Sequence, residues 1–236
     1  APVSELQEKY GSPNPKGLME YISTCKREFK PQTKFQYSCL NYITLQHIIE
    51  TITGQSLRDF AKENIFDILG MQYTDYLPTI QQQDGKWINT VACPWMDRIA
   101  PTEKQKDGSV LCGQVHDPLA RILNGGISGN AGIFSNANDI GILAAALLNG
   151  GEYNGHRILS PLGVKTMCTV PRELTAFGRT PGWDIFSPYA SNKGDLFSPN
   201  TFGHTGYTGT SIIIDPDNDT AVILLVNAVH PEDRHS

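Results

Sequence analysis

A few short stretches of the sequence carry side chains that could perform acyl-group chemistry. Ser23 and Lys26 are spaced as S-x-x-K, Tyr37 lies in F-Q-Y-S-C, His116 lies in V-H-D-P, and His204 lies in F-G-H-T-G-Y. A serine hydroxyl is a poor nucleophile at its ordinary pKa, so acyl transfer needs a neighbouring base and two backbone N–H groups that bind the oxyanion. Phenol and imidazole groups can transfer the proton if the fold brings them to the nucleophile.

Helices are predicted on both sides of these stretches. After Asn41 the apolar residues recur at helical spacing, and Gly54 provides a left-handed stop. Ser56 can cap a second helix, which ends at Gly70. Further helices are expected at about 17–27, about 138–148 and from residue 160 onward.

The remaining segments are predicted to be irregular or extended. Residues 1–17 contain prolines and glycines and are expected to be irregular, and residues 78–118 are expected to be rich in loops. Residues 125–132 hold four glycines in eight positions, which indicates close backbone packing or positive φ angles. Residues 209–227 predict a β-hairpin with two almost continuously apolar arms, so we expect it inside a sheet that is covered on both faces.

Composition excludes several classes of protein. The 236 residues include 19 Lys and Arg against 24 Asp and Glu, without a basic run, so nucleic acid is not an expected partner. No apolar stretch approaches the roughly 20 residues that cross a bilayer. Five cysteines without a C-x-x-C pair predict neither a disulfide framework nor a zinc site, and no metal or cofactor is expected. The predicted class is α+β in one compact unit, with a mostly helical region (1–180), antiparallel strands (181–228) and a tail (229–236).

Three stretches, in this order, resemble a known superfamily. They are FQYSCLNY followed by IIETITGQSLRDFAKENIFDILGM, then NGGISGNAGIFSNANDIGILAAALLNGG, and finally FGHTGYTGTSIIIDPDNDTAVILLVN. The combination resembles the serine β-lactamase and penicillin-binding-protein superfamily, most of all its class C and esterase-like branch. The resemblance implies a β-lactamase/DD-peptidase-like fold and hydrolysis of an amide or ester through an acyl-enzyme. In such proteins the nucleophile lies in S-x-x-K, the tyrosine of Y-x-N relays a proton, and K-T-G lies on an edge strand.

The resemblance assigns catalytic roles to two residues of this chain. Tyr37 matches the tyrosine of Y-x-N, and His204 matches the lysine of K-T-G. A tyrosine has a reference pKa of about 10, so it needs a nearby positive charge to act as a base at neutral pH. A lysine is always charged there, whereas a histidine is only partly charged. We therefore expect an intact enzyme to lose some activity in a His204→Ala variant and to show a pH dependence that a His204→Lys variant lacks.

The resemblance also assigns residues that bind the substrate. Thr205 and Gly206 complete the motif, and the backbone N–H of Tyr207 would donate to the oxyanion. His116 would line the cleft, since similar V-H-D stretches occur in relatives. Cys39 stands where Y-x-N has its asparagine. Because a thiol is only a weak donor, this departure favours an esterase-like or less specific hydrolase.

The larger departure concerns the nucleophile. Ser23 lies only 14 positions before Tyr37, whereas the serine of the family lies many tens of residues upstream, so we expect this S-x-x-K to be coincidental. The chain is therefore predicted to be a fragment of a serine hydrolase, inactive alone, with the missing N-terminal part of the same protein as a partner. A small molecule or a cell-wall peptide is the expected substrate, and the periplasm or cell surface is the location that the family suggests.

Two alternatives to this prediction remain open. The chain could be a noncatalytic module that binds a cell-wall peptide or a partner domain on the same fold. It could also be a cysteine hydrolase that uses Cys39, although the sequence shows no acid or base paired with that thiol.

Overall fold

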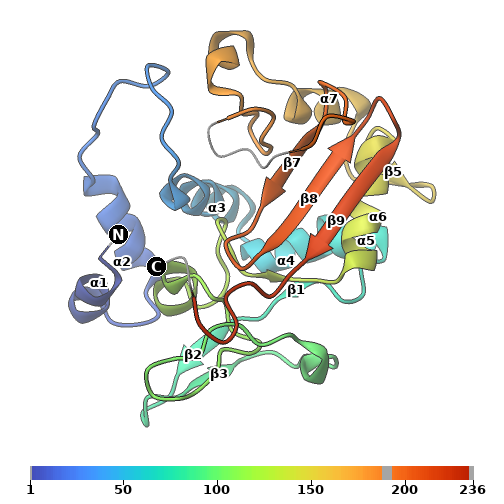
Figure 1. The fold of residues 1–236 in the computed structure, drawn as a ribbon. Coiled ribbons are helices and arrows are strands. Elements are labelled where there is room, and N and C mark those ends of the chain that lie inside the picture. The colour runs from blue at the N-terminus through green and yellow to red at the C-terminus, as the bar shows by residue number, and fades with distance from the viewer. Residues whose placement is uncertain (1, 188–192, 234–236) are drawn as a thin grey trace.

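The computed structural model describes residues 2–187 and 193–233, which form helices, short strand pairs and one antiparallel sheet with helices packed against one of its faces (Figure 1). The sheet has the order β7 (Phe202–Thr205), β8 (Thr210–Asp215) and β9 (Thr220–Leu225). The helices are α1 (Val3–Tyr10), α2 (Pro15–Thr24), α3 (Cys39–Thr53), α4 (Leu57–Ala61), α5 (Asp67–Leu69), α6 (Ala137–Leu148) and α7 (Pro161–Cys168). This mixed architecture confirms the predicted α+β class.

Three small antiparallel pairs lie outside that sheet. They are β1 (Asp75–Tyr76) with β4 (Ile133–Phe134), β2 (Thr79–Gln81) with β3 (Trp87–Asn89), and β5 (Glu152–Tyr153) with β6 (His156–Arg157). Single turns of π-helix cover Lys62–Phe66 and Leu119–Leu123, and 3-10 turns cover Met96–Arg98 and Arg172–Phe177. Residues 78–118 are otherwise mostly irregular, which confirms the loop-rich prediction for this segment.

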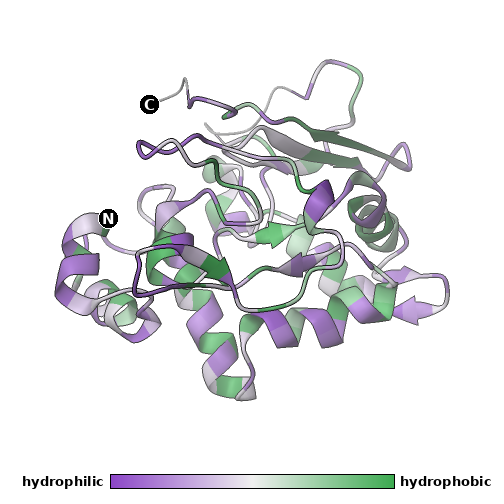
Figure 2. Cartoon of the chain, turned by 90° about the horizontal axis from the view of Figure 1, so that it is seen from below, coloured by the Kyte–Doolittle hydropathy of each residue, from purple (hydrophilic) through white to green (hydrophobic). Residues whose placement is uncertain are grey.

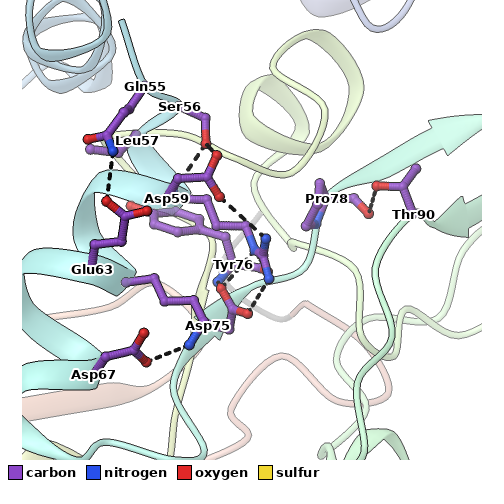
Figure 3. Close-up of polar contacts among 12 residues, drawn as sticks. Gln55, Ser56, Leu57, Asp59, Glu63, Asp67, Asp75, Tyr76, Pro78 and Thr90 are labelled. Carbon is purple, nitrogen blue, oxygen red and sulfur yellow. Dashed lines mark hydrogen bonds and ion pairs between the residues drawn. The ribbon is translucent and has the colours of Figure 1, made fainter. Parts of the chain in front are cut away.

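The tandem helices end at the two predicted glycines, and the second begins at the predicted serine, whereas the first begins at Cys39, two residues before the predicted start. Gly54 ends α3 in the left-handed conformation, at φ +71°. The Ser56 hydroxyl accepts a hydrogen bond from the Asp59 amide and donates one to its carboxylate, which fixes the start of α4 (Figure 3). Arg58 then joins α4 to β1, because its Nε and Nη2 donate to the two carboxylate oxygens of Asp75 at 2.9 and 2.6 Å. The predicted second helix is therefore real, although a π turn separates α4 from α5.

The glycine-rich segment packs directly against α3, as its composition predicts. A Cβ atom at Gly129 would lie 2.1 Å from the Tyr42 carbonyl oxygen, so only glycine fits there without displacement. The buried Gln46 side chain holds the same segment: its Oε1 accepts from the Gly129 amide at 3.0 Å, and its Nε2 donates to the Ile127 carbonyl at 3.1 Å. These contacts fix the position of α3 and of the residues that lead into it.

The first residues of the chain differ from the prediction. Val3–Tyr10 form α1 rather than an irregular segment, because Leu6 is buried in a cluster with Leu18 of α2 and Ile43 of α3. Packing at one face of this helix outweighs the effect of the flanking prolines.

The residues that the structure describes cover only one face of the sheet. Phe202, Ile214 and Ala221 pair across the three strands and face α6 and α7. On the other face Val222 and Leu224 keep 45% and 55% of their surface exposed. The prediction of a sheet covered on both faces is therefore wrong for these residues, since continuous apolar sequence indicates two-sided burial but cannot say which segment covers the second face.

Helix α3 also carries apolar side chains that face solvent. Leu45, Ile48 and Ile52 are 49%, 46% and 78% exposed, whereas Ile43 on the opposite side is buried. Figure 2 shows hydrophobic residues distributed along the helices and concentrated in the long strands of the sheet. A helix that is apolar on several sides is normally covered on all of them. Among the described residues, this face of α3 has no covering segment.

Among the described residues, none of the helices combines the length and the hydropathy that crossing a bilayer requires.

Candidate active site

Tyr37 lies at the entrance to α3, between two neighbouring cavities of about 310 and 290 Å³. Arg179 lines both cavities as well, so these two side chains form a wall that the cavities share. The larger cavity is mostly apolar; its lining includes Phe35, Tyr42, Leu45, Leu174 and Phe177. The smaller cavity is lined by more charged side chains, including Asp184 and Lys193, and contains the residues of the sequence motif.

The smaller cavity lies at the edge strand of the sheet, where the motif residues are found. His204, Thr205, Gly206 and Tyr207 all line it together with Tyr37. His204 pairs with Ile212 of β8 and is on the same face of the strand as the buried Phe202. The structure thus brings a phenol and an imidazole that are 167 positions apart to the wall of one cavity, the arrangement that the sequence motifs predict.

Sequence reasoning missed three charged residues that also line this cavity, Asp184, Lys193 and Arg179. Arg179 contacts both motif side chains. Its Nη2 lies 2.5 Å from Nε2 of His204, and its Nη1 donates to Oδ2 of Asp184 at 3.2 Å. Its guanidinium carbon also lies 5.3 Å from the centre of the Tyr37 ring, within cation–π range. Arg179 belongs to no sequence motif. Two isolated β-bridges bring it to the cavity, because Arg179 pairs with Asp184 and Asp184 pairs with Gly203 of β7.

The environment of Tyr37 keeps its phenol protonated. Burial raises the pKa of Tyr37, and the neighbouring Cys39 and Asp117 raise it further, while the charge of Arg179 lowers it. The net pKa is above the ordinary value of tyrosine. Within this chain the phenol is therefore a neutral group, which can relay a proton only by releasing its own while it accepts another.

A tight turn follows the motif and exposes a backbone donor. Gly206 donates its amide to Thr210 and accepts from the amide of Gly209 at 3.0 Å. Within the part of the chain that the structure describes, the amide of Tyr207 has no backbone acceptor, as an oxyanion donor requires.

The Tyr207 side chain leads from the turn to His116. Its hydroxyl donates to Asp233 at 2.6 Å, and this hydrogen bond raises the pKa of the phenol. The rings of Tyr207 and His116 stack with their centres 5.7 Å apart, and Nε2 of His116 lies 3.2 Å from Glu103. His116 is thus next to the motif turn but behind Tyr207, rather than among the described residues that line the smaller cavity.

The thiol and the S-x-x-K serine lie elsewhere. Cys39 is the first residue of α3, close to Asp117 and Asn130, and burial followed by the charge of Asp117 raises its pKa. Ser23 donates to the Glu20 carbonyl near the end of α2, and that helix ends before Lys26. Of the described residues, neither Cys39 nor Ser23 is among those that line the two cavities around Tyr37.

The side chains suited to metal binding are scattered. In the described ranges, no group of three or more His, Cys, Asp or Glu residues could hold a metal ion.

Solved structures share this fold. A penicillin-binding-protein homologue from Caulobacter crescentus aligns with a TM-score of 0.61 at 17% identity, over 90% of this chain and 58% of that one. EstCE1, a hydrolase with promiscuous acyltransferase activity, aligns with a TM-score of 0.60 at 19% identity, over 92% of this chain and 57% of that one. At these identities the likeness shows the fold and no more, and it confirms the β-lactamase/penicillin-binding-protein architecture that the sequence predicts.

Similarity in sequence is closer to two bacterial proteins. A protein of Escherichia coli (strain K12), provisionally named a D-alanyl-D-alanine carboxypeptidase, is 35% identical over 226 residues, which are 90% of this chain and 49% of that protein. A protein of the same provisional name from Salmonella gallinarum is 32% identical over 97% of this chain and 53% of its own length. The chain thus spans about half the length of these relatives. The family model described as Beta-lactamase matches residues 3–236, and the chain belongs to this family of serine hydrolases.

Proposed function

We propose that this chain forms one side of the active site of a serine hydrolase that cleaves an amide or ester through an acyl-enzyme. The observation that carries the proposal is the convergence of Tyr37 and His204 on one cavity, beside the turn that exposes the Tyr207 amide. The names of the sequence relatives favour peptides that end in D-alanyl-D-alanine as substrates. Export to the periplasm or cell surface would fit such a substrate.

The geometry supports a defined role for each group. A serine Oγ would attack the substrate carbonyl carbon, and its proton would pass through the Tyr37 phenol to the departing amine or alcohol as the C–N or C–O bond breaks. The Tyr207 amide would donate to the oxyanion of the tetrahedral intermediate. Water would then cleave the acyl-serine through the same relay in reverse.

We propose further that the nucleophile comes from an S-x-x-K segment outside these 236 residues, and that the chain alone is inactive. The location of Ser23, away from the two cavities around Tyr37, supports this proposal. The exposed apolar face of α3 supports it too, because a segment that covers Leu45 would border the larger cavity, which Leu45 and Tyr37 both line.

The test uses the reading frame extended upstream of Ala1. We expect it to contain S-x-x-K, and we expect the extended protein, but not the 236-residue chain, to be labelled by a fluorophosphonate or penicillin probe. A Tyr37→Phe variant should be labelled about 10²–10⁴-fold more slowly, the usual value of a general acid or base. Tyr42→Phe is the matched control, since this phenol lines only the apolar cavity and donates to the Pro181 carbonyl.

The other outcomes decide against the proposal. An extended protein that contains S-x-x-K but is not labelled would favour the noncatalytic module that binds a wall peptide or a partner domain. Activity that iodoacetamide abolishes, and that a Cys39→Ser variant lacks, would favour a cysteine hydrolase. The raised pKa of Cys39 argues against that last outcome, because the thiolate is the reactive form.

A further inference from the structure

The contacts of His204 define which of its two ring nitrogens carries a proton. Nε2 faces the guanidinium of Arg179 at 2.5 Å, and Nδ1 faces the carbonyl oxygen of Thr205 at 2.7 Å. A guanidinium has only donors and keeps its proton in proteins, and a carbonyl oxygen has only lone pairs. Nε2 must therefore accept, and Nδ1 must donate. Both contacts are satisfied together only by a neutral imidazole with its proton on Nδ1.

We propose that Arg179 is a positioning residue that holds His204 in this neutral form and itself supplies the permanent positive charge beside Tyr37. The expectation that His204 provides a partial charge is thereby replaced. The lysine of K-T-G has two functions, charge and position, and in this chain they are divided between an arginine and a histidine. The catalytic meaning of this inference rests on the proposed function, but the arrangement itself does not.

The surroundings of Arg179 fit a fixed charge rather than a mobile one. Its side chain is only 11% exposed, and that of its ion-pair partner Asp184 is 8% exposed. Asp184 is held in turn by the amide and hydroxyl of Ser187, at 3.1 and 2.7 Å, and by backbone hydrogen bonds with Gly203 of β7. The guanidinium is thus tied to the strand that carries His204, so its distance from the imidazole is set by the sheet.

The same guanidinium reaches Tyr37 across the shared wall of the two cavities. It lies over the Tyr37 ring, and its charge favours the phenolate form of that residue. Because arginine stays protonated at any pH at which proteins are folded, this charge does not vary with pH. A His204→Lys substitution would place a second cation against Arg179 and should weaken the site instead of improving it.

Nuclear magnetic resonance of the imidazole nitrogens tests the inference in the 236-residue chain without any need for activity. With ¹⁵N-labelled protein at pH 7.5, we expect the pyridine-type shift of an unprotonated nitrogen at Nε2 of His204 and the pyrrole-type shift at Nδ1. In an Arg179→Met variant, the guanidinium no longer excludes a proton from Nε2, so the shift of this nitrogen should move toward the pyrrole-type value. A wild-type imidazole that is protonated at Nε2, or at both nitrogens, would overturn the proposal.

A second readout follows the Tyr37 phenol by its ¹³Cζ shift during a pH titration. The midpoint should move upward in Arg179→Met and stay nearer the wild-type value in Arg179→Lys, which keeps the charge. Arg157→Met is the matched control, since it removes an exposed arginine paired with Glu152 and should change neither readout. A Tyr37 midpoint that Arg179→Met leaves unchanged would refute the electrostatic role. If Arg179→Met does not fold, the wild-type tautomer and the Arg179→Lys titration still decide the question. A failure of the proposed function would appear instead in the probe labelling of the extended protein.

Discussion

Replacing Gly129 by alanine offers a direct test of how the glycine-rich segment positions α3. The added Cβ would lie 2.1 Å from the Tyr42 carbonyl oxygen, 2.8 Å from the carbonyl carbon and 3.2 Å from Cβ of Gln46. The first two of these atoms belong to the backbone of a helix and cannot rotate away. Gly129 does not have a positive φ, so alanine brings a steric clash without a conformational penalty.

The structure allows the cost to be estimated. Inserting a methyl group into a packed site costs about 1–3 kcal/mol, because neighbouring groups must shift. A shift of this segment also lengthens the hydrogen bonds that Gln46 makes with Gly129 and Ile127, and each of these contributes about 1 kcal/mol. Together these effects predict a loss of about 2–4 kcal/mol in the free energy of unfolding. For a chain of this length, the Tm would fall by roughly 4–16 °C.

Urea denaturation followed by circular dichroism measures this loss, and a thermal scan checks the fall in Tm. Gly141→Ala is the matched control, since the nearest atom to its added Cβ is Cδ1 of Ile223 at 3.8 Å, an ordinary contact. Inside α6 that change should leave the stability unchanged or raise it by about 0.5–1 kcal/mol. If Gly129→Ala unfolds within about 0.5 kcal/mol of wild type, the segment yields easily and does not fix α3.

Two further predictions concern buried acid groups and thiols. Burial opposes ionisation of Asp215, but hydrogen bonds from Ser198, Asn218 and the amide of Asp217 outweigh it and hold its pKa below the ordinary value. Its contribution to stability is therefore complete above the unfolded pKa of about 3.9 and is lost as the pH falls through the lower folded value. Asp215→Asn should lower the free energy of unfolding at pH 7 by about 1.5–3 kcal/mol. It should also make that free energy fall less steeply as the pH is lowered below about 4. Urea titrations at several pH values measure this, and an equally steep fall in the variant would contradict the reasoning. Among the thiols, iodoacetamide at pH 7.5 should modify the exposed Cys112 first, and Cys168 slowly, because burial raises the pKa of Cys168 to about 11. Peptide mapping by mass spectrometry gives the order, and rapid modification of Cys168 would contradict the reasoning.

Local signals in the sequence predict much of the fold but not its long-range contacts. Ser56, Gly54 and Gly70 mark helix ends because capping depends on neighbouring residues only. Helix α1 was not predictable in this way, since it is stabilised by burial of Leu6 against distant residues. The exposed outer face of the sheet was missed because the composition of a strand such as β9 does not reveal which segments cover it.

The candidate site likewise combines residues that the sequence predicts with others that it does not. Tyr37 and His204 lie in recognisable motifs, and the structure places both at one cavity. Arg179 lies in no motif, and it reaches His204 only because bridges from Asp184 to Gly203 bring its segment beside β7. Which ring nitrogen of His204 holds a proton depends on that contact, so the sequence predicted the histidine but could not predict the cation beside it.

The apolar side chains that α3 and β9 leave in water affect how the chain behaves in solution. These surfaces favour self-association, because contact between copies releases ordered water from the exposed side chains of Leu45, Ile48, Val222 and Leu224. Only the net charge of −5 opposes such contact, and it vanishes near the isoelectric point of about 5.7. Concentrated samples should therefore remain dispersed in mildly alkaline buffer of low ionic strength and cluster when they are acidified toward that point.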